Sequence, residues 1–255
     1  MVEKTILVEK KEGVARITLA RPKHNVMNIE MIHQLNRELE RLLEDKELKC
    51  LVLLGQGPSF CAGVEVGDHK PDKVEEMIAS FNRIFLLLDS LEVPSIAAVQ
   101  GICLGGGMEL AIACDMLVAS EKASFGQPEI KLGFLPPYAA VRLPELVGVS
   151  RAIEICTTGK RYSAQEAVAM GFVTRAVPAE QFEAAVNALI GEIVSSSALI
   201  IRLNKRAVKD YRGRNLPSAL EGVGDLFLNT LMKTEDTMEG IRSFEEKRPA
   251  QWRNR

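Results

Sequence analysis

The chain has 255 residues, of which 47% are hydrophobic and 26% are charged, and its formal net charge is −2. A chain of this length and apolar content can bury a full core as one large domain, or as one domain with an appendage. Because the charge is nearly balanced and no block of like charges occurs, the sequence lacks the electrostatic pattern of proteins that bind nucleic acid or anionic membranes.

The cysteines and the N-terminal segment indicate the compartment. An odd number of cysteines without a CxxC spacing favours reduced thiols in a core; they are Cys50, Cys61, Cys103, Cys114 and Cys156. The N-terminal residues alternate like a strand, and no run approaches the ~20 apolar residues of a membrane span. We therefore expect a cytoplasmic protein without a membrane segment.

The first predicted elements are a hairpin and a helix. Two β-rich runs, 5–9 and 14–19, flank a Lys-Glu-Gly turn at 11–13 and predict an opening hairpin. Asn28 is a suitable N-cap for a helix, and the apolar residues that follow it keep helical spacing, namely Ile32, Leu35, Leu39 and Leu42.

A weak internal repeat follows, in which a buried strand runs into a turn of small residues. It covers 50–63 (CLVLLGQGPSFCAG), 95–107 (SIAAVQGICLGGG) and 115–129 (DMLVASEKASFGQPE), with a predicted helix from about Val74 that stops before Pro94. Stacked turns of this kind favour a spiral of strand, strand and helix over a flat doubly wound sheet. The fold class is thus predicted to be α/β.

The C-terminal part is predicted to be mainly helical. Ser163 and Glu166 form a capping box for a short helix that Gly171 ends, and 172–177 is predicted to be a strand. A composition shift near 195–200 divides the chain into a core, 1–197, and a helical region, 198–255. The helical region has apolar residues that need a partner surface, either its own core or another subunit: Leu220, Val223, Leu226, Leu231, Met238 and Ile241.

The segment Gly101–Leu110 (GICLGGGMEL) is the most informative part of the sequence. Its triple glycine opens a helix and leaves backbone N–H groups unpaired at the positive helix end, with Glu109 one turn further in and Glu129 twenty positions later. Such a pair of acids beside exposed amides can act as general base and general acid on a substrate whose carbonyl oxygen gains negative charge. Taken alone, Glu109 also fits a solvent-facing helix position, and Glu129 fits an acid that complements a helix dipole.

Other catalytic motifs are absent from the sequence. The glycines match neither GxGxxG nor a P-loop, which disfavours dinucleotide and nucleotide phosphate binding. There is no GxSxG elbow, no HExxH and no histidine pair at ligand spacing. We therefore expect no bound metal.

The segments IAAVQGICLGGGMELAIACD and ASFGQPEIKLGFLP together resemble the crotonase family, the enoyl-CoA hydratases and isomerases. The resemblance extends from RITLARPKHNVMN to the terminal EGIRSFEEKRPAQW and so covers essentially the whole chain. It implies a crotonase-like ββα spiral core with a helical C-terminal trimerisation region, assembled as a homotrimer or a dimer of trimers.

The resemblance also implies the site residues. Backbone amides of Val64 and Gly106 would form an oxyanion hole for an acyl-CoA thioester, and Glu109 and Glu129 match the two catalytic glutamates of family hydratases. No cofactor is implied, because CoA is part of the substrate. The substrate-binding positions that it implies are Lys23, His24, Ala62, Tyr138 and Lys247, the last commonly reaching CoA from a neighbouring subunit.

The chain departs from the family pattern after Glu129. Typical hydratases continue into a glycine-rich stretch resembling IPGAGGTQRL, whereas this chain has larger residues at Leu135–Leu143, which predicts a reshaped acyl pocket. This change and the shortened RPKHNVMN loop are most similar to the cyclohexadienoyl-CoA hydratases. In that case Tyr138 would line or orient the ring of the substrate, with core packing as its alternative. His69 and Asp68 are expected either at the pocket mouth or in a solvated loop.

Three functions stay open on the sequence. The leading hypothesis is a hydratase for a short or cyclic enoyl-CoA, because both glutamates are retained. The alternatives are an enoyl-CoA double-bond isomerase and a noncatalytic acyl-CoA-binding protein of the same fold.

Overall fold

The chain begins with an antiparallel hairpin. In the computed structural model, which describes residues 4–255, β1 (Ile6–Lys11) pairs with β2 (Val14–Leu19) in unbroken register. The turn between them uses Glu12 and Gly13 at positive φ. The predicted hairpin is therefore confirmed.

A six-stranded sheet forms the centre of the core. Its order is β1-β2-β3-β5-β7-β10, and every pairing after the hairpin is parallel. Both faces of its central strands are covered, as a parallel sheet requires. The remaining strands are β3 (Cys50–Gly55), β5 (Ser95–Val99), β7 (Met116–Ser120) and β10 (Arg175–Val177).

The last strand is shorter than the sequence predicts. We expected a strand over 172–177, but only Arg175–Val177 pairs with β7. Thr174 explains the difference, because its backbone N–H donates to Leu117 O (3.0 Å) and its hydroxyl accepts from Leu117 N (3.1 Å). A side chain thus takes the place of one ladder contact, and the residues before it are buried without strand pairing.

A second sheet has four strands in the order β4-β6-β8-β9. Each repeated segment of the sequence sends one strand into the large sheet and the next into the small one, as β3/β4, β5/β6 and β7/β8. This is the spiral that the repeat predicts. The strands of the small sheet are β4 (Ser59–Cys61), β6 (Ile102–Leu104), β8 (Ser124–Gly126) and β9 (Arg161–Ser163).

Helices cover the two faces of the large sheet. On one face, the main hydrophobic core includes buried residues of α1, α2 and α3, and on the other, Val186, Leu189 and Ile190 of α7 pack against a smaller cluster from the sheet. Asn28 caps α1 by accepting from Met31 N (3.0 Å), as predicted. The helices of the core are α1 (Ile29–Leu43), α2 (Val74–Ser90), α3 (Gly106–Ala113), α4 (Pro137–Val147), α5 (Val149–Thr158), α6 (Ala164–Met170) and α7 (Phe182–Val194).

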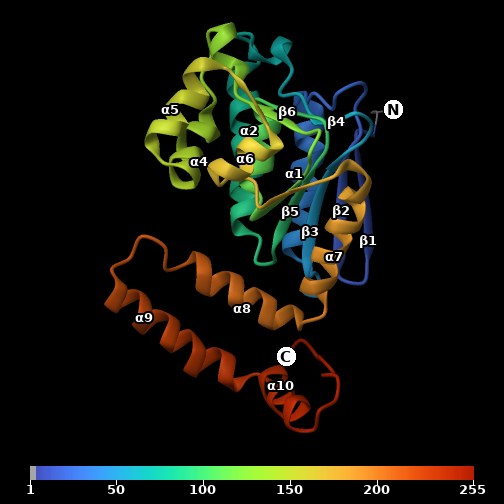
Figure 1. Ribbon diagram of the computed structural model, residues 1–255, viewed down its shortest axis with the longest axis vertical. Coiled ribbons are helices and arrows are strands. Elements are labelled where there is room, and N and C mark those ends of the chain that lie inside the picture. The colour runs from blue at the N-terminus through green and yellow to red at the C-terminus, as the bar shows by residue number, and fades with distance from the viewer. Residues whose placement is uncertain (1–3) are drawn as a thin grey trace.

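The C-terminal helices lie at one end of the core, with α10 near the C-terminus (Figure 1). Their bounds are α8 (Ala198–Lys209), α9 (Leu216–Asp225) and α10 (Glu235–Glu245). The predicted division at 197/198 falls between Ser197, which caps α8, and Ala198, its first residue. The division of the chain into a catalytic core, 1–197, and an oligomerisation region, 198–255, stays a prediction.

Basic side chains on one face of α8 attach it to the core. Arg202 donates to the carbonyl oxygens of the turn after α1, and Lys209 donates to Asp89 near the end of α2. Between them, Lys205 Nζ donates to Val93 O (2.8 Å) and to Asp115 Oδ2 (2.6 Å), just beyond the C-terminal end of α3. Cations near helix C-termini also interact favourably with the helix dipoles.

Apolar residues of α9 and α10 remain exposed in the single chain. Of the predicted set, Leu226 is buried, whereas Leu220, Met238 and Ile241 are exposed. Phe227, Leu228 and Phe244 add further exposed apolar surface. Packing on the chain's own core therefore accounts for only part of this pattern.

No single helix within residues 4–255 is long and apolar enough to cross a membrane. Taken together, the helical segments Ala179–Val194 and Ala198–Lys209 have the length and apolar composition of a membrane span, but the chain bends by 100° between them.

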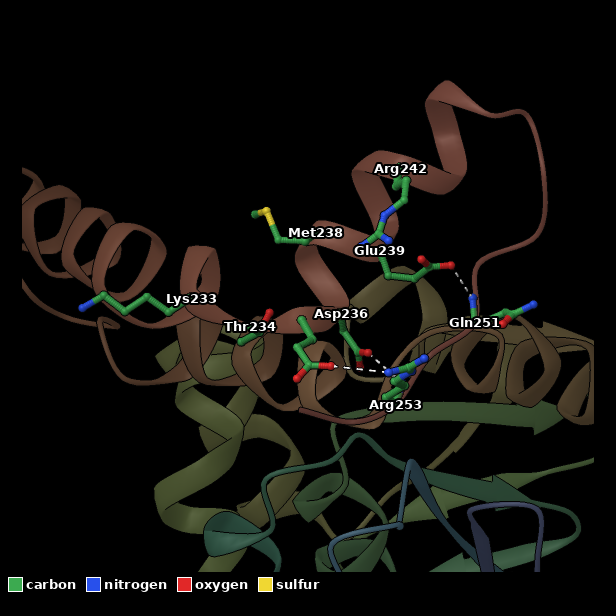
Figure 2. Close-up of a pocket in the computed structure, with 9 residues that line it drawn as sticks. Lys233, Thr234, Asp236, Met238, Glu239, Arg242, Gln251 and Arg253 are labelled. Atoms are coloured by element: carbon green, nitrogen blue, oxygen red, sulfur yellow. Dashed lines mark hydrogen bonds and ion pairs between the residues drawn. The ribbon is translucent and has the colours of Figure 1, made fainter.

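Asp236 joins the last helix to the rest of the chain. Its carboxylate accepts from Ser197 Oγ (2.5 Å), Arg253 N (2.7 Å) and Asn254 N (2.8 Å), and the residue is only 1% exposed. Figure 2 shows Asp236 and Arg253 at this junction, beside a cavity of about 420 Å³. One buried carboxylate thus connects α8, α10 and the C-terminal segment.

We predict that Asp236→Ala lowers the free energy of unfolding by about 3 kcal/mol, because the buried Ser197 hydroxyl and the partly buried amides of Arg253 and Asn254 lose their acceptor. Urea denaturation followed by circular dichroism measures this. The control is Glu235→Ala, since the ion pairs of Glu235 lie at the surface and should contribute less than about 1 kcal/mol. Equal losses in the two variants would contradict the prediction.

Candidate active site

The start of α3 is built from consecutive glycines. Gly105 has φ +53°, in the left-handed region, and its N–H continues the small sheet by donating to Gly126 O (2.9 Å). A Cβ at Gly105 would lie 2.6 Å from Glu129 Oε1, and one at Gly106 would lie 2.6 Å from Val64 Cγ2. Glycine therefore lets the helix start approach both Val64 and Glu129 closely.

Val64 presents its backbone N–H beside that helix start. It forms an isolated parallel bridge with Met27, in which Met27 N donates to Gly63 O (2.9 Å) and Glu65 N donates to Met27 O (2.8 Å). This pattern uses the groups on either side of Val64 and leaves its own N–H on the opposite edge. Within residues 4–255, neither this amide nor that of Gly106 has a recorded acceptor.

These groups line one cavity of about 320 Å³. Glu109 and Glu129 lie in its wall together with Val64, Gly106 and Ala62. The rest of the lining is mainly apolar and includes Val66, Val74, Met77, Ile78, Phe81, Leu132, Phe134, Leu135 and Pro137. The structure therefore brings five of the nine predicted site residues together.

Glu109 is almost completely buried, with 2% of its surface exposed. Its Oε1 accepts from Ala139 N (2.8 Å) at the N-terminus of α4, and the Tyr138 amide also favours its charged form. Burial outweighs these contacts, and the charge of Glu129 adds to it, so that the pKa of Glu109 is raised to about 7.

Glu129 lies in a short 3₁₀ helix, η2 (Pro128–Leu132), and burial raises its pKa to about 7 as well. With its amide nitrogen facing the carboxylate, the fully buried Gln127 donates to both oxygens of Glu129 at 3.1 Å. Gln127 thus orients Glu129. Two carboxyl groups that titrate near neutrality can each hold or release a proton at the same pH.

Lys23 and His24 line a neighbouring cavity of about 470 Å³. A backbone hydrogen bond links the walls of the two cavities: Ala62, which lines the first, donates from its N–H to the carbonyl oxygen of His24, which lines the second (2.9 Å). His24 is itself held by a 2.8 Å contact between its Nδ1 and Ser59 Oγ. The two positions are therefore adjacent to the glutamate cavity and outside it.

Tyr138 does not place its ring in the glutamate cavity. The ring stacks on Phe85 with centroids 3.8 Å apart and lines a separate cavity together with residues of α2 and α8. The sequence left substrate contact and core packing open for this side chain, and the structure packs it against the main core. Helix α4 begins at Pro137 and directs the amides of its first turn at Glu109. In this structure Tyr138 contributes its backbone.

Lys247 is exposed and follows α10, which Figure 1 shows well apart from β4 and β6. It is not among the residues that line the glutamate cavity of its own chain.

The sequence missed part of the cavity wall. His69 and Phe134 both line it and stack on each other with centroids 4.8 Å apart and an interplanar angle of 28°. The apolar residues after Glu129 were a usable sign, since a solvated loop would be polar. The sequence allowed two places for His69, the pocket mouth or a solvated loop. The structure places it in the cavity wall.

The family assignment follows from comparison with known proteins. A model of the enoyl-CoA hydratase/isomerase family matches residues 9–255. The chain belongs to this family. The resemblance found in the sequence is thus confirmed, and the family supports a hydro-lyase of the enoyl-CoA hydratase type.

Relatives in the family match over their full length. The chain is 35% identical over 251 residues to cyclohexa-1,5-dienecarbonyl-CoA hydratase of Thauera aromatica, covering 98% of this chain and 96% of that protein. It is 33% identical over 256 residues to crotonyl-CoA hydratase of Syntrophomonas wolfei, covering 98% of each. The crystal structure of enoyl-CoA hydratase from Bacillus anthracis superposes with a TM-score of 0.93 at 31% identity, covering 99% of this chain and 100% of that one. The crotonase fold is therefore shown.

No cluster of three or more histidine, cysteine or acidic residues that could hold a metal ion occurs in the described part of the chain. The groups available for chemistry in the cavity are the two carboxyls, the unpaired amides and His69.

We predict that the free energy of unfolding falls less with rising pH in Glu109→Gln than in the wild type. With a pKa of about 7 instead of 4.5, folded Glu109 holds its proton where the unfolded chain has lost it, so the free energy of unfolding falls as pH rises through this window. Between pH 5 and 8 the wild type should lose about 2 to 3 kcal/mol that the variant keeps. Urea titrations at both pH values test this, with exposed Glu180→Gln as the control. An identical pH dependence in wild type and E109Q would contradict it.

We also predict that Gly105→Ala lowers kcat by about 10²-fold, because the new Cβ displaces the Glu129 carboxylate. Gly213→Ala is the matched control, since Gly213 also has positive φ (+74°) but nothing lies within 4 Å of its added Cβ. Both variants place a Cβ on a residue at positive φ. Steady-state rates on an enoyl-CoA substrate should therefore separate the two, and equal losses would show that strain alone is responsible.

Proposed function

We propose that the protein adds water to a conjugated enoyl-CoA thioester, with Glu109 and Glu129 as the proton-transfer pair. The observation that carries this proposal is that both carboxyls, with pKa values raised to about 7, line the same cavity as the unpaired amides of Val64 and Gly106. The resemblance to the family implies that members retaining only one of the two glutamates tend to be isomerases. Retention of both favours hydration.

In the proposed reaction the thioester oxygen accepts from the amides of Val64 and Gly106. Ionised Glu109, supported by the amides of α4, takes a proton from water, whose oxygen bonds to the β carbon. The double-bond electrons move toward the thioester, and its oxygen gains negative charge. Protonated Glu129 then gives its proton to the α carbon, so that one water is added overall. Loss of one oxyanion donor in such a site costs about 10²- to 10³-fold in rate.

The acyl group is proposed to be short or cyclic. Leu135 and Pro137, which stand where typical hydratases have a glycine-rich stretch, line the cavity with larger side chains. The Thauera relative is named for a cyclic dienoyl substrate and the Syntrophomonas relative for crotonyl-CoA, so both are candidates. The CoA portion would extend from Ala62 toward Lys23 and His24. Because hydration changes no oxidation state, we propose that CoA enters as substrate and that no cofactor is resident.

We further propose a homotrimer or a dimer of trimers. The exposed apolar residues of α9 and α10 supply a surface that the single chain does not cover. In such an assembly Lys247 would reach the CoA of a neighbouring subunit.

The test uses crotonyl-CoA and cyclohexa-1,5-diene-1-carbonyl-CoA with products identified by mass. We expect hydroxyacyl products gaining one water from at least one substrate. Glu109→Gln and Glu129→Gln should each lower kcat by about 10²- to 10⁴-fold while CoA affinity is largely kept. Glu180→Gln again serves as the control.

Isomerised product of unchanged mass would identify a double-bond isomerase. A protein that binds acyl-CoA equally well in all variants without turnover would be a noncatalytic binding protein. Either result overturns the proposed hydratase.

A further inference from the structure

His69 has a fixed orientation in the wall of the glutamate cavity. It ends a 3₁₀ turn, η1 (Val66–His69), that begins two residues after Val64. Its ring stacks on Phe134, whose own N–H donates to Glu129 O (3.0 Å). The ring thus spans the cavity wall between the segment that holds the Val64 amide and the segment that holds Glu129.

The hydrogen bonding of His69 identifies its tautomer. Nδ1 lies 3.0 Å from Glu65 O, and because a carbonyl oxygen can only accept, Nδ1 must carry the proton. In the neutral ring Nε2 is therefore an acceptor. Nε2 has no recorded partner within residues 4–255 and is free to bind a ligand.

The cavity wall that includes His69 contains few other polar groups. The oxyanion amides are assigned to the thioester and the two carboxyls to proton transfer, and the side chains near His69 in the wall are apolar, such as Val66, Leu132 and Phe134. Among the described residues Nε2 thus has no donor, and its side chain lines a mainly apolar cavity. A ligand atom that donates a hydrogen bond gains from it, and a methyl group of the same size does not.

We propose that His69 Nε2 binds a hydroxyl group on the acyl chain, so that the cavity selects hydroxyl-bearing acyl-CoA thioesters over unsubstituted ones. This inference rests on the proposed function, because it assumes that acyl-CoA occupies the cavity. A hydroxyl fits better than an oxo group, since only the hydroxyl can donate to Nε2. His69 is then a specificity-determining residue, distinct from the proton-transfer pair.

The test measures equilibrium binding, which needs no turnover. Saturated CoA thioesters of 4-hydroxybutanoate, 5-hydroxypentanoate and 6-hydroxyhexanoate are compared by calorimetry with pentanoyl-, hexanoyl- and heptanoyl-CoA, in which a methyl replaces the hydroxyl. At the chain length that reaches Nε2, the wild type should bind the hydroxyl compound about 3- to 10-fold more tightly than its methyl counterpart.

Three variants locate the effect. His69→Phe keeps a ring to stack on Phe134 and should abolish the preference. His69→Gln, whose amide reaches about as far as Nε2, should restore part of it. His33→Phe, an equivalent change on α1 away from the cavity, should leave it intact. The ratio within each variant corrects for any general loss of affinity.

The inference is overturned if the wild type shows no hydroxyl preference at any length, or if the preference survives in His69→Phe. If no acyl-CoA binds to the wild type at all, the proposed function itself fails. The two failures are therefore distinct.

Discussion

The close approach of α3 to three neighbouring segments is the constraint on which the site depends. Besides Gly105 and Gly106, a Cβ at Gly107 would lie 2.2 Å from Cys61 O in β4. Each of the three glycines thus allows a different contact: with Glu129, with the loop at Val64, and with the small sheet. A bulkier helix start would separate the two amides and move them away from both carboxyls.

The burial that gives the glutamates their pKa values also costs stability above neutral pH. Glu109 and Glu129 are held in this arrangement by contacts elsewhere, including the amides of α4 and the side chain of Gln127. Strain and unfavourable burial at functional sites persist only where the surrounding structure is well determined. Here the parallel sheet and its covering helices supply that surrounding structure.

Sequence reasoning was most successful where the determinant is local. The hairpin, the cap at Asn28 and the capping box at Ser163 each depend on a few adjacent residues, and all three are present. A helix start and a motif predicted the two glutamates as a pair, and both line one cavity; their role in catalysis stays a prediction. Tyr138 and His69 were harder, since their positions depend on how α4 and η1 cross the core. The start of β10 was missed for a similar reason: Thr174 replaces a ladder contact that only tertiary structure reveals.

The salt bridge between Lys205 and Asp115 lies close to the site along the chain, because α3 is short. This helix has eight residues, Gly106–Ala113, and is therefore only about 12 Å long. Its first residue supplies an amide of the site, and Asp115, just past its end, is held by Ser95 and by α8. Local opening of a protein occurs in cooperative units. Detachment of α8 would remove the Lys205 contact from Asp115, so the C-terminal helices contribute to holding the far end of α3.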